Sequence, residues 1–476
     1  MKSPMGSWLL FVIGGVLAVG CNTSGVSGPG GTLGAGAGTV VYLADQDTPG
    51  VFELYVAGTG TKVNPNLTAP KTVTSFGLTP DRSAVIYIAD QDTAGKSELY
   101  RVSLSALGAS TKLNGVLVGG GNVTSFAITP DSSSVVYRGD QTTDEVFEIY
   151  RTVIAGGANA KLNPAYSGSQ DIEVFDVLPN STGVVYRADQ DTDGISELYR
   201  VLFAVPGTSV ALIAPALSAG QNTGSFAITP DSGSVAYIAN RLSTAKNELF
   251  IVAAGGGSST QLNDTLVAGG NVLSVAIASD GLSVVYLADR EVDERFELYR
   301  TIISGVVKSK VNPDLTGSED VLSFAFIPDS SGVVYVADQT TDEVFEIYRT
   351  VFSGSVNTTL NPAFAGTEDV ADFVVIPDGT GVVYRADQNT NDVNELYRAV
   401  FGVAGATRLN PPGLVGGQNI ASYAVASDSG SVTYRANQDN PGIVELYRTF
   451  LASAGTSTKL NSALVIGEDV TGFALR

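Results

Sequence analysis

The chain has 476 residues, and its 48 Asp and Glu outnumber its 27 Lys and Arg, which gives a formal net charge of −21. This charge repels nucleic-acid phosphates and anionic membrane surfaces rather than neutralising them. The chain has no His and one Cys. Zinc sites of Cys and His, haem or iron–sulfur ligation, internal disulfides and His-activated nucleophiles are therefore excluded. Cations, basic proteins and neutral ligands such as glycans remain as partner classes.

The N-terminal residues have the pattern of a secretory signal. A single cation, Lys2, precedes an apolar run from Trp8 to Val19, which is too short to span a bilayer as a helix. The segment from Leu17 to Cys21 reads Leu-Ala-Val-Gly-Cys and resembles the bacterial lipoprotein signal. This resemblance implies cleavage before Cys21 and lipidation of that cysteine. The alternative is an ordinary signal peptide, cleaved after a small residue, with an incidental cysteine.

We therefore expect residues 1–20 to be a lipoprotein signal peptide and residues 21–39 to be the lipidated Cys21 followed by a flexible tether. The tether is rich in Gly, Ser and Thr, and its root-mean-square reach is about 20–25 Å. The expected location is the bacterial cell envelope, facing the periplasm or the cell surface. The membrane is contacted through the lipid anchor only.

From residue 40 onward the chain is a ninefold repeat. A fixed period of this size is typical of a propeller or a solenoid. A central Tyr recurs at intervals of 45 to 51 residues, at Tyr42, Tyr87, Tyr137, Tyr186, Tyr237, Tyr286, Tyr335, Tyr384 and Tyr434.

Each unit contains four candidate strands, which the fifth copy illustrates. Runs of β-branched and aromatic residues predict strands at 225–228, 234–239, 248–252 and 260–262. The segment Thr229-Pro230-Asp231-Ser232-Gly233 predicts a β-turn, because Pro fixes φ and Asp or Ser can hydrogen-bond the turn backbone. Apolar residues on both faces of the second strand favour burial between neighbouring sheets.

The repeated motifs resemble those of TolB-type propellers. Each unit carries versions of Thr-Pro-Asp-Ser, of Val-x-Tyr-x-Ala-Asp-Gln-Asp-Thr-x-Gly and of Glu-Leu-Tyr, and the resemblance covers residues 40–476. The sequence departs from the family in having Ser or Gly where Gly usually follows Pro-Asp, and in having Ser-Asp for Pro-Asp at Ser279 and Ser427. The resemblance implies a periplasmic or surface propeller that engages other macromolecules, and it implies no single activity.

The two ends of the repeat region complement each other. The first unit begins at its second strand, Val40-Val41-Tyr42, whereas the chain finishes with an extra first strand at 470–475. Pairing these strands completes a ninth blade and removes two exposed sheet edges. We therefore predict an all-β fold over residues 40–476. It is a single, monomeric β-propeller of nine four-stranded antiparallel blades, closed by pairing of the C-terminal strand with the N-terminal blade.

The turns between second and third strands carry 20 of the 48 carboxylates, from eight of the nine units. In a propeller these turns share one face with the connections into the next blade, so this "acidic face" should be strongly negative. It could dock a basic protein partner or divalent cations, or its Asp and Asn could serve only as turn formers. Our candidate binding residues on it are Asp289, Glu291, Asp293, Glu294, Asp338 and Asp342.

One turn, residues 189–194, reproduces the Asp-x-Asp-x-Asp-Gly opening of calcium-binding loops. Asp189, Asp191 and Asp193 would bring three oxygen donors to Ca²⁺. The turn lies between strands rather than helices, and it lacks the Glu at the twelfth loop position. Apart from this speculative calcium ion, we expect no cofactor.

The third strands repeat Glu, Tyr and Arg, as in Glu197, Tyr199 and Arg200, with Glu and Tyr on one strand face and Arg on the other. We interpret Glu and Arg as structural. We predict a non-enzymatic module that binds a protein or glycan of the cell envelope through its acidic face. The alternative is a carboxylate-based glycan hydrolase or lyase, with two Asp or Glu roughly 5–10 Å apart in the central channel beside a deep cleft.

Overall fold

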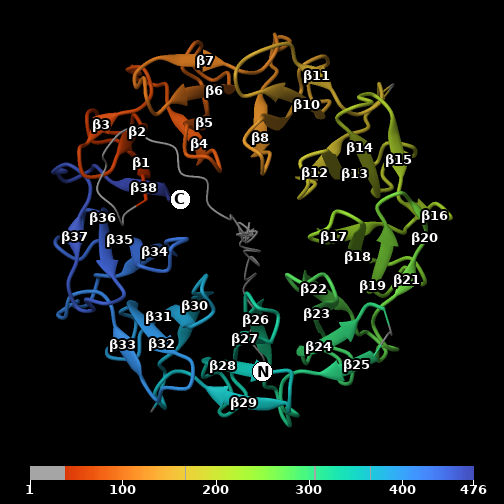
Figure 1. Ribbon diagram of the computed structural model, residues 1–476, viewed down its shortest axis with the longest axis vertical. Helices are drawn as coiled ribbons and strands as arrows, with labels where there is room; N and C mark the ends of the chain where they lie inside the picture. The colour runs from red at the N-terminus through yellow and green to blue at the C-terminus, as the bar shows by residue number, and fades with distance from the viewer. Residues whose placement is uncertain (1–37, 167, 305–306, 365, 476) are drawn as a thin grey trace, which may run out of the picture.

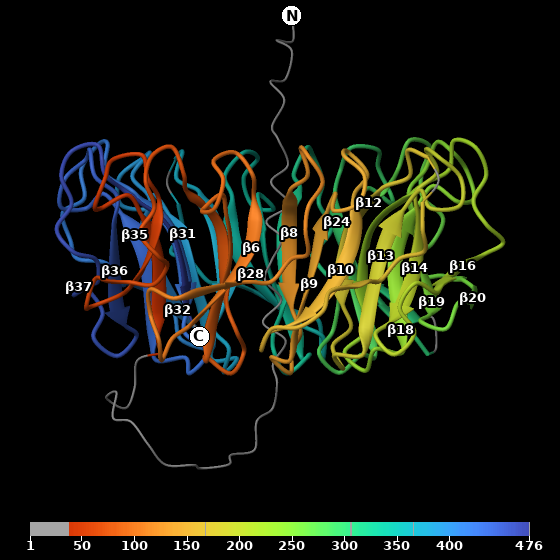
Figure 2. The ribbon, with the colours of Figure 1, turned by 90° about the horizontal axis from the view of Figure 1, so that it is seen from above.

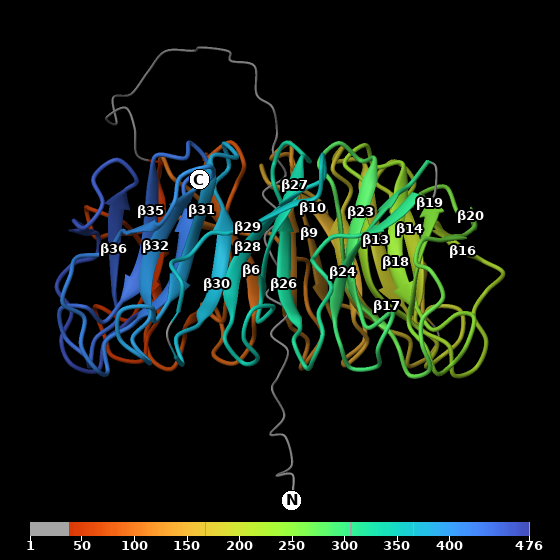
Figure 3. The same cartoon turned by 90° about the horizontal axis from the view of Figure 1, so that it is seen from below.

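The computed structural model describes residues 38–166, 168–304, 307–364 and 366–475. These residues form nine four-stranded antiparallel sheets, arranged as blades around a central axis (Figure 1). Seen from the side, the ring is a short drum with loops on both faces (Figure 2 and Figure 3). The predicted all-β, nine-bladed propeller is confirmed. The predicted signal peptide, Cys21 and the tether up to residue 37 lie outside the described residues.

Within each blade the strands follow one another from the axis outward, and we number the blades 1 to 9 from the closing blade. The first strands are β38 (Val470–Leu475), β4 (Val73–Leu78), β8 (Val123–Ile128), β12 (Ile172–Val177), β17 (Thr223–Ile228), β22 (Val272–Ile277), β26 (Val321–Phe326), β30 (Val370–Val375) and β34 (Ile420–Val425). The second strands are β1 (Val40–Ala44), β5 (Ala84–Ala89), β9 (Ser134–Gly139), β13 (Gly183–Ala188), β18 (Ser234–Ala239), β23 (Ser283–Ala288), β27 (Gly332–Ala337), β31 (Gly381–Ala386) and β35 (Ser431–Ala436).

The third and fourth strands complete each blade toward the outer rim. The third strands are β2 (Glu53–Val56), β6 (Glu98–Ser103), β10 (Glu148–Val153), β14 (Glu197–Leu202), β19 (Glu248–Ala253), β24 (Glu297–Ile302), β28 (Glu346–Val351), β32 (Glu395–Val400) and β36 (Glu445–Phe450). The fourth strands are β3 (Thr61–Lys62), β7 (Ser110–Lys112), β11 (Ala160–Lys161), β15 (Ser209–Ala211), β21 (Thr260–Gln261), β25 (Val307–Lys310), β29 (Val356–Thr359), β33 (Ala406–Arg408) and β37 (Thr458–Lys459).

The core lies between the blades. The second strands β5 and β23 are buried at every position, because neighbouring blades cover both of their faces. Val85 and Tyr87 of blade 2 pack in one cluster with Val41 and Leu54 of blade 1. In each of the nine blades the second-strand Tyr stacks on the third-strand Tyr or Phe, with ring centroids 5.4–5.7 Å apart. Such pairs contribute about 0.5–1.5 kcal/mol beyond their buried area.

The ring closes as the chain ends predict. β38 pairs antiparallel with β1, with Tyr42 opposite Phe473 and Val41 opposite Ala474, and the two strands lie side by side in Figure 1. The strand order of blade 1 is β3-β2-β1-β38. This pairing leaves no open edge between the first and last repeats.

The turns between first and second strands form the face opposite the acidic face. In blade 2 the backbone N–H of Ser83 donates to Asp81 Oδ1 at 3.0 Å, as the turn motif predicts. The next blade contributes Ser132, which adopts a left-handed φ of 59° and accepts a hydrogen bond from the N–H of Asp81 at 3.0 Å. This bond between blades explains why Ser can stand where a turn of this shape favours Gly.

One feature of blades 4 and 5 is absent from the repeat pattern. Strands β16 (Ile213–Ala214) and β20 (Gly257–Ser258) form a two-stranded parallel sheet at the outer rim (Figure 1). Ile213 stands where most units have Asn after the fourth strand, and this change frees the segment to pair with the neighbouring blade.

Candidate functional site

The first residue of each second-to-third-strand turn holds that turn in place. In blade 7, Asp338 Oδ1 accepts a hydrogen bond from the N–H of Asp320 at 2.5 Å, and Oδ2 accepts one from the N–H of Glu343 at 3.0 Å. Asp320 precedes the innermost strand, so the turn and the connection between blades share one face, as predicted. The same two bonds occur at Asp45, Asp90, Asp140, Asp189, Asp289 and Asp387.

Asp289 and Asp338 are therefore turn anchors, which corrects their assignment to the binding surface. They are only 2% and 3% exposed, and both carboxylate oxygens of each accept backbone hydrogen bonds. A partner docked on this face cannot reach them.

Seven of the twenty turn carboxylates are anchors, and the other thirteen are exposed to solvent. They are Asp47, Asp92, Asp144, Glu145, Asp191, Asp193, Glu291, Asp293, Glu294, Asp342, Glu343, Asp392 and Asp439. Eight of the nine blades contribute to these thirteen side chains, and blade 5 has none. Four of them pair with a fourth-strand lysine at 2.7–2.8 Å, namely Asp47, Asp92, Glu291 and Asp439.

The four exposed candidates differ in their contacts. Glu291 lies 2.7 Å from Lys310 Nζ, and Asp342 accepts a hydrogen bond from Ser318 Oγ at 2.9 Å. Asp293 lies directly over Gly269, which has a φ of +87°. Glu294 follows it in the same turn and is exposed. The structure thus brings Glu291, Asp293 and Glu294 together in one turn of blade 6, with Asp342 in blade 7.

The three aspartates of the calcium motif differ in their contacts. Asp189 is a turn anchor, and Asp193 accepts a hydrogen bond from Ser169 Oγ at 2.9 Å. Asp191 is exposed. Among the residues that the structure describes, no group of three or more His, Cys, Asp or Glu is arranged to hold a metal ion. Calcium at this turn remains a prediction.

A buried glutamate begins every third strand and is part of a polar network. In blade 1, Glu53 is 2% exposed and accepts hydrogen bonds from Lys62 Nζ at 2.6 Å and Asn64 Nδ2 at 3.4 Å. Lys62 Nζ also lies 2.8 Å from Asp47 and 5.8 Å from the centroid of the Tyr55 ring. Burial lowers the pKa of Lys62, but hydrogen bonds to Asp47 and Glu53 outweigh it and raise the pKa overall.

The lysine and asparagine of this network are the residues that sequence reasoning missed. Their signal was available, because Lys-x-Asn recurs at the end of the fourth strand. It occurs at Lys62-Val63-Asn64, Lys112-Leu113-Asn114, Lys161-Leu162-Asn163, Lys310-Val311-Asn312 and Lys459-Leu460-Asn461.

Three carboxylates stand on the innermost strands, where a catalytic pair would lie. Glu173 pairs with Arg187 at 2.6 Å, and Asp372 pairs with Arg385 at 2.6 Å. Asp176 has no such partner among the described residues, and burial raises its pKa to about 6. Water reaches this carboxyl, but the surrounding protein removes enough of its hydration to raise its pKa.

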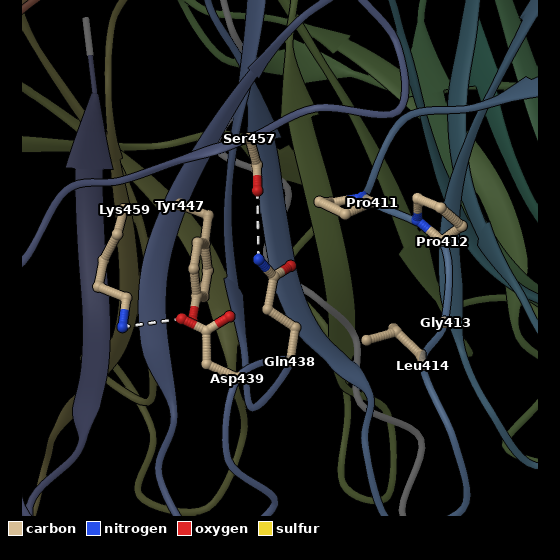
Figure 4. A pocket seen from close by; sticks show the side chains of 9 residues that line it. All are labelled: Pro411, Pro412, Gly413, Leu414, Gln438, Asp439, Tyr447, Ser457 and Lys459. Atoms are coloured by element: carbon tan, nitrogen blue, oxygen red, sulfur yellow. Dashed lines mark hydrogen bonds and ion pairs between the residues drawn. The ribbon is translucent and has the colours of Figure 1, made fainter.

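A polar pocket of about 380 Å³ lies at the outer rim between blades 8 and 9 (Figure 4). Pro411 and Pro412 form one side of it (Figure 4). On the other side, Lys459 Nζ pairs with Asp439 at 2.8 Å, and Gln438 donates to a serine hydroxyl. The polar groups in this pocket are therefore already engaged with one another.

In the part of the chain that the structure describes, there is no helix of the length and apolarity needed to span a membrane.

Comparisons with known proteins support the fold. The sequence matches no protein-family model and no curated protein. A eukaryotic initiation factor superposes with a TM-score of 0.58 and 10% identity, covering 91% of this chain and 98% of that one. Dipeptidyl peptidase 4 of Porphyromonas gingivalis gives a TM-score of 0.51 and 12% identity, covering 70% of this chain and 52% of the peptidase.

TolB proteins are also structural neighbours. TolB of Acinetobacter baumannii matches with a TM-score of 0.32 and 18% identity, covering 57% of this chain and 62% of TolB. The likenesses to the initiation factor and the peptidase, at 10% and 12% identity, show the fold alone. This chain spans about half the length of the peptidase that it matches.

Proposed function

We propose that this protein is a non-enzymatic binding module of the cell envelope that docks a basic partner on its acidic face. The observation that carries this proposal is the exposure of thirteen turn carboxylates, from eight of nine blades, on one face of the ring. Four of them are offset by lysines, and the other nine form no ion pair among the described residues. Charge of one sign on one face attracts a basic partner and makes association depend on salt.

Placement in the envelope rests on the sequence. The segment from Leu17 to Cys21 resembles a lipoprotein signal, and a lipid on Cys21 would hold the ring about 20–25 Å from the membrane. At this distance the acidic face can meet proteins or glycans of the envelope.

The test removes three charges from the densest turn and leaves its anchor, Asp289, unchanged. Glu291→Gln, Asp293→Asn and Glu294→Gln are combined in one variant. We expect the association rate with proteins captured from envelope extract to fall several-fold at low salt, and this difference to vanish at high salt. Surface plasmon resonance at two ionic strengths measures both effects.

A matched control neutralises three carboxylates on the opposite face, with Asp81→Asn, Asp131→Asn and Asp231→Asn. Asn is compatible with these turns, because Asn180 in blade 4 accepts the equivalent hydrogen bond from the N–H of Thr182 at 3.1 Å. Equal losses from the two triple variants, or association unaffected by salt, would reject the acidic face as the docking site.

The same preparations test the rival function. A glycan hydrolase or lyase would release new sugar ends from envelope glycans. We expect no such release, and turnover that persists in both triple variants would assign the protein to that class instead.

A further inference from the structure

The nine blades provide nine versions of the polar network around the buried third-strand glutamate. In blades 1, 2, 6 and 9 a fourth-strand lysine joins this glutamate to a carboxylate of the second-to-third-strand turn. The lysine Nζ lies 2.7–2.8 Å from the turn carboxylate and 2.6–3.1 Å from the glutamate. Each of these blades therefore has at least two carboxylates around one ammonium group, and in blade 6 Asp314 adds a third at 3.0 Å.

Blade 4 keeps both carboxylates and lacks the ammonium group. Asp191 and Glu197 stand at the positions of Asp92 and Glu98 in blade 2. Ala211 replaces the lysine, as the register of the paired strands shows. Ala211 lies opposite Tyr199, as Lys112 lies opposite Tyr100 and Lys62 lies opposite Tyr55.

The other blades without this lysine have also lost the turn carboxylate. Blade 5 has Leu242 in the turn and Gln261 in the fourth strand, and blade 7 has Thr340 and Thr359. Gln261 Nε2 then donates to the glutamate of blade 5 at 2.9 Å. Among the nine blades, two carboxylates without a cation of their own occur in blade 4.

A second observation concerns Tyr199, which is 1% exposed and whose Oη forms no hydrogen bond of ordinary length with any residue that the structure describes. The equivalent tyrosines of blades 2 and 9 donate to their glutamates at 3.1 Å and 2.9 Å. Burial raises the pKa of Tyr199, and the charges of Asp191 and Glu197 and the contact of its hydroxyl with Asp191 raise it further. A buried hydroxyl that approaches two carboxylates without a well-formed hydrogen bond marks an incomplete polar site.

The surroundings of Glu197 do not place a cation in contact with it. Its Oε1 accepts a hydrogen bond from the N–H of Leu217 at 2.8 Å, and Ile213 has replaced the asparagine of the other blades. Burial raises the pKa of Glu197, and the charge of Arg241 offsets this only in part. The Arg241 guanidinium itself donates to the carbonyl of Ala214 at 2.7 Å and to a tyrosine hydroxyl of blade 5. Glu197 forms no ion pair with any residue that the structure describes.

We propose that Asp191, Glu197 and Tyr199 form an ammonium seat, a site that binds the primary ammonium group of a ligand. The ligand's –NH₃⁺ would replace the lysine Nζ of the other blades, with its three N–H donors directed at the two carboxylates. The Tyr199 ring would lie beside the cation, as in blades 1, 2 and 9, where Nζ lies 5.8–5.9 Å from the ring centroid. Ala211 is exposed, so the ligand's alkyl chain can enter from solvent.

The ligand is either a small alkylamine or the side chain of a lysine on a partner protein. Both present the same chemical group to the seat. The ammonium seat does not depend on the docking function proposed above, because it would hold a free amine even if no protein bound the acidic face.

The test titrates the folded full-length protein with n-butylammonium and, separately, with Nα-acetyl-lysine methylamide, followed by ligand-observed NMR. We expect saturable binding of at least one of the two to a single site. The tighter of the two ligands identifies the source.

In Ala211→Lys, which supplies the missing ammonium, this binding should be lost and the melting temperature should rise. Asp191→Asn should weaken binding about tenfold, which corresponds to about 1.4 kcal/mol.

The matched control creates a second ammonium seat. Lys112→Ala in blade 2 leaves Asp92, Glu98 and Tyr100 in place, and the number of bound ammonium ions per chain should double. Thr359→Ala in blade 7, where the turn carboxylate is absent, should leave the stoichiometry unchanged. Equal binding to wild type and Ala211→Lys overturns the proposal, as does Ca²⁺ that binds at Asp191 and is not displaced by either amine.

Discussion

In seven of the nine blades a single aspartate after the second strand decides how the acidic turn folds. Asp338 Oδ1 and Oδ2 each accept a backbone hydrogen bond, and Asp338→Ala would leave two N–H groups without partners. We expect a loss of about 2–4 kcal/mol in the free energy of unfolding. Asp342→Ala, which alters an exposed side chain four residues later, should change it by less than about 0.5 kcal/mol. Urea denaturation of the two variants measures the difference, and equal effects would contradict the anchor role.

The innermost strand of blade 4 contains an unfavourable carboxylate. Asp176 stands where blades 3 and 5 have Ala127 and Ala227, and burial raises its pKa to about 6 from 3.8. Because the folded state binds the proton more tightly than the unfolded chain, deprotonation destabilises the fold. This penalty is fully present above pH 6 and disappears as the pH falls from 6 toward 4.

Asp176→Ala should therefore stabilise the protein at pH 7. We expect a gain of about 1 kcal/mol in the free energy of unfolding. This is less than the whole pKa shift would contribute, because water still reaches the carboxyl. The gain should shrink to near zero at pH 4. Unfolding midpoints of wild type and variant at pH 4, 5, 6 and 7 test this, and a difference that does not change with pH would refute the assigned pKa.

The sequence could predict that the turns are acidic, but it could not predict which of their carboxylates face solvent. Asp289 and Glu291 are two residues apart, yet Asp289 is buried and Glu291 is exposed. The difference depends on the N–H of Asn271, eighteen residues earlier, which donates to Asp289. A contact between distant segments leaves no trace in the local pattern of charged residues.

Among the elements, strands were predictable where one blade repeats another. The predicted strand at 234–239 coincides with β18 (Ser234–Ala239), because its apolar run and its turn are local features. The parallel pair of β16 and β20 was not predictable. It joins segments 44 residues apart, with Ile213 opposite Gly257, and each strand has only two residues.

The strand that closes the ring is the element whose removal should matter most. Deletion of residues 470–476 removes β38 from blade 1 and exposes the edge of β1. Val470 is fully buried, and Phe473 and Leu475 pack in the same cluster. Loss of these apolar contacts should cost at least about 3 kcal/mol. We expect the melting temperature to fall by several degrees in differential scanning calorimetry.

A point variant in the same strand serves as the control for this deletion. Thr471 is exposed, so Thr471→Ala should leave the melting temperature unchanged. A truncated protein that melts at the wild-type temperature would show that the pairing of β38 with β1 does not stabilise the ring.

At the scale of the whole molecule, hydrogen bonds join neighbouring blades on both faces of the ring. On the acidic face, Asp320 of blade 7 accepts a hydrogen bond from the N–H of Phe296 in blade 6 at 2.6 Å. On the opposite face, Ser330 Oγ of blade 7 accepts one from the N–H of Asp280 in blade 6 at 3.2 Å. Each blade thus contacts mainly its two neighbours, and stability is distributed around the ring as in other repeat proteins.

The residues that precede the ring carry our prediction of its position in the cell. A net charge of −21 repels the protein from anionic lipid surfaces, so we expect membrane association only through the lipid predicted on Cys21. Each buried CH₂ of an acyl chain contributes about 0.8 kcal/mol, and more than one chain is needed for stable anchoring.

Expressed in a bacterium, the full chain should partition into the detergent phase of a Triton X-114 separation. Cys21→Ser should move it to the aqueous phase without changing the melting temperature of the ring, because Cys21 lies ahead of the first strand, β1 (Val40–Ala44). An intact mass that shows an unmodified residue at the mature N-terminus would refute the lipid anchor.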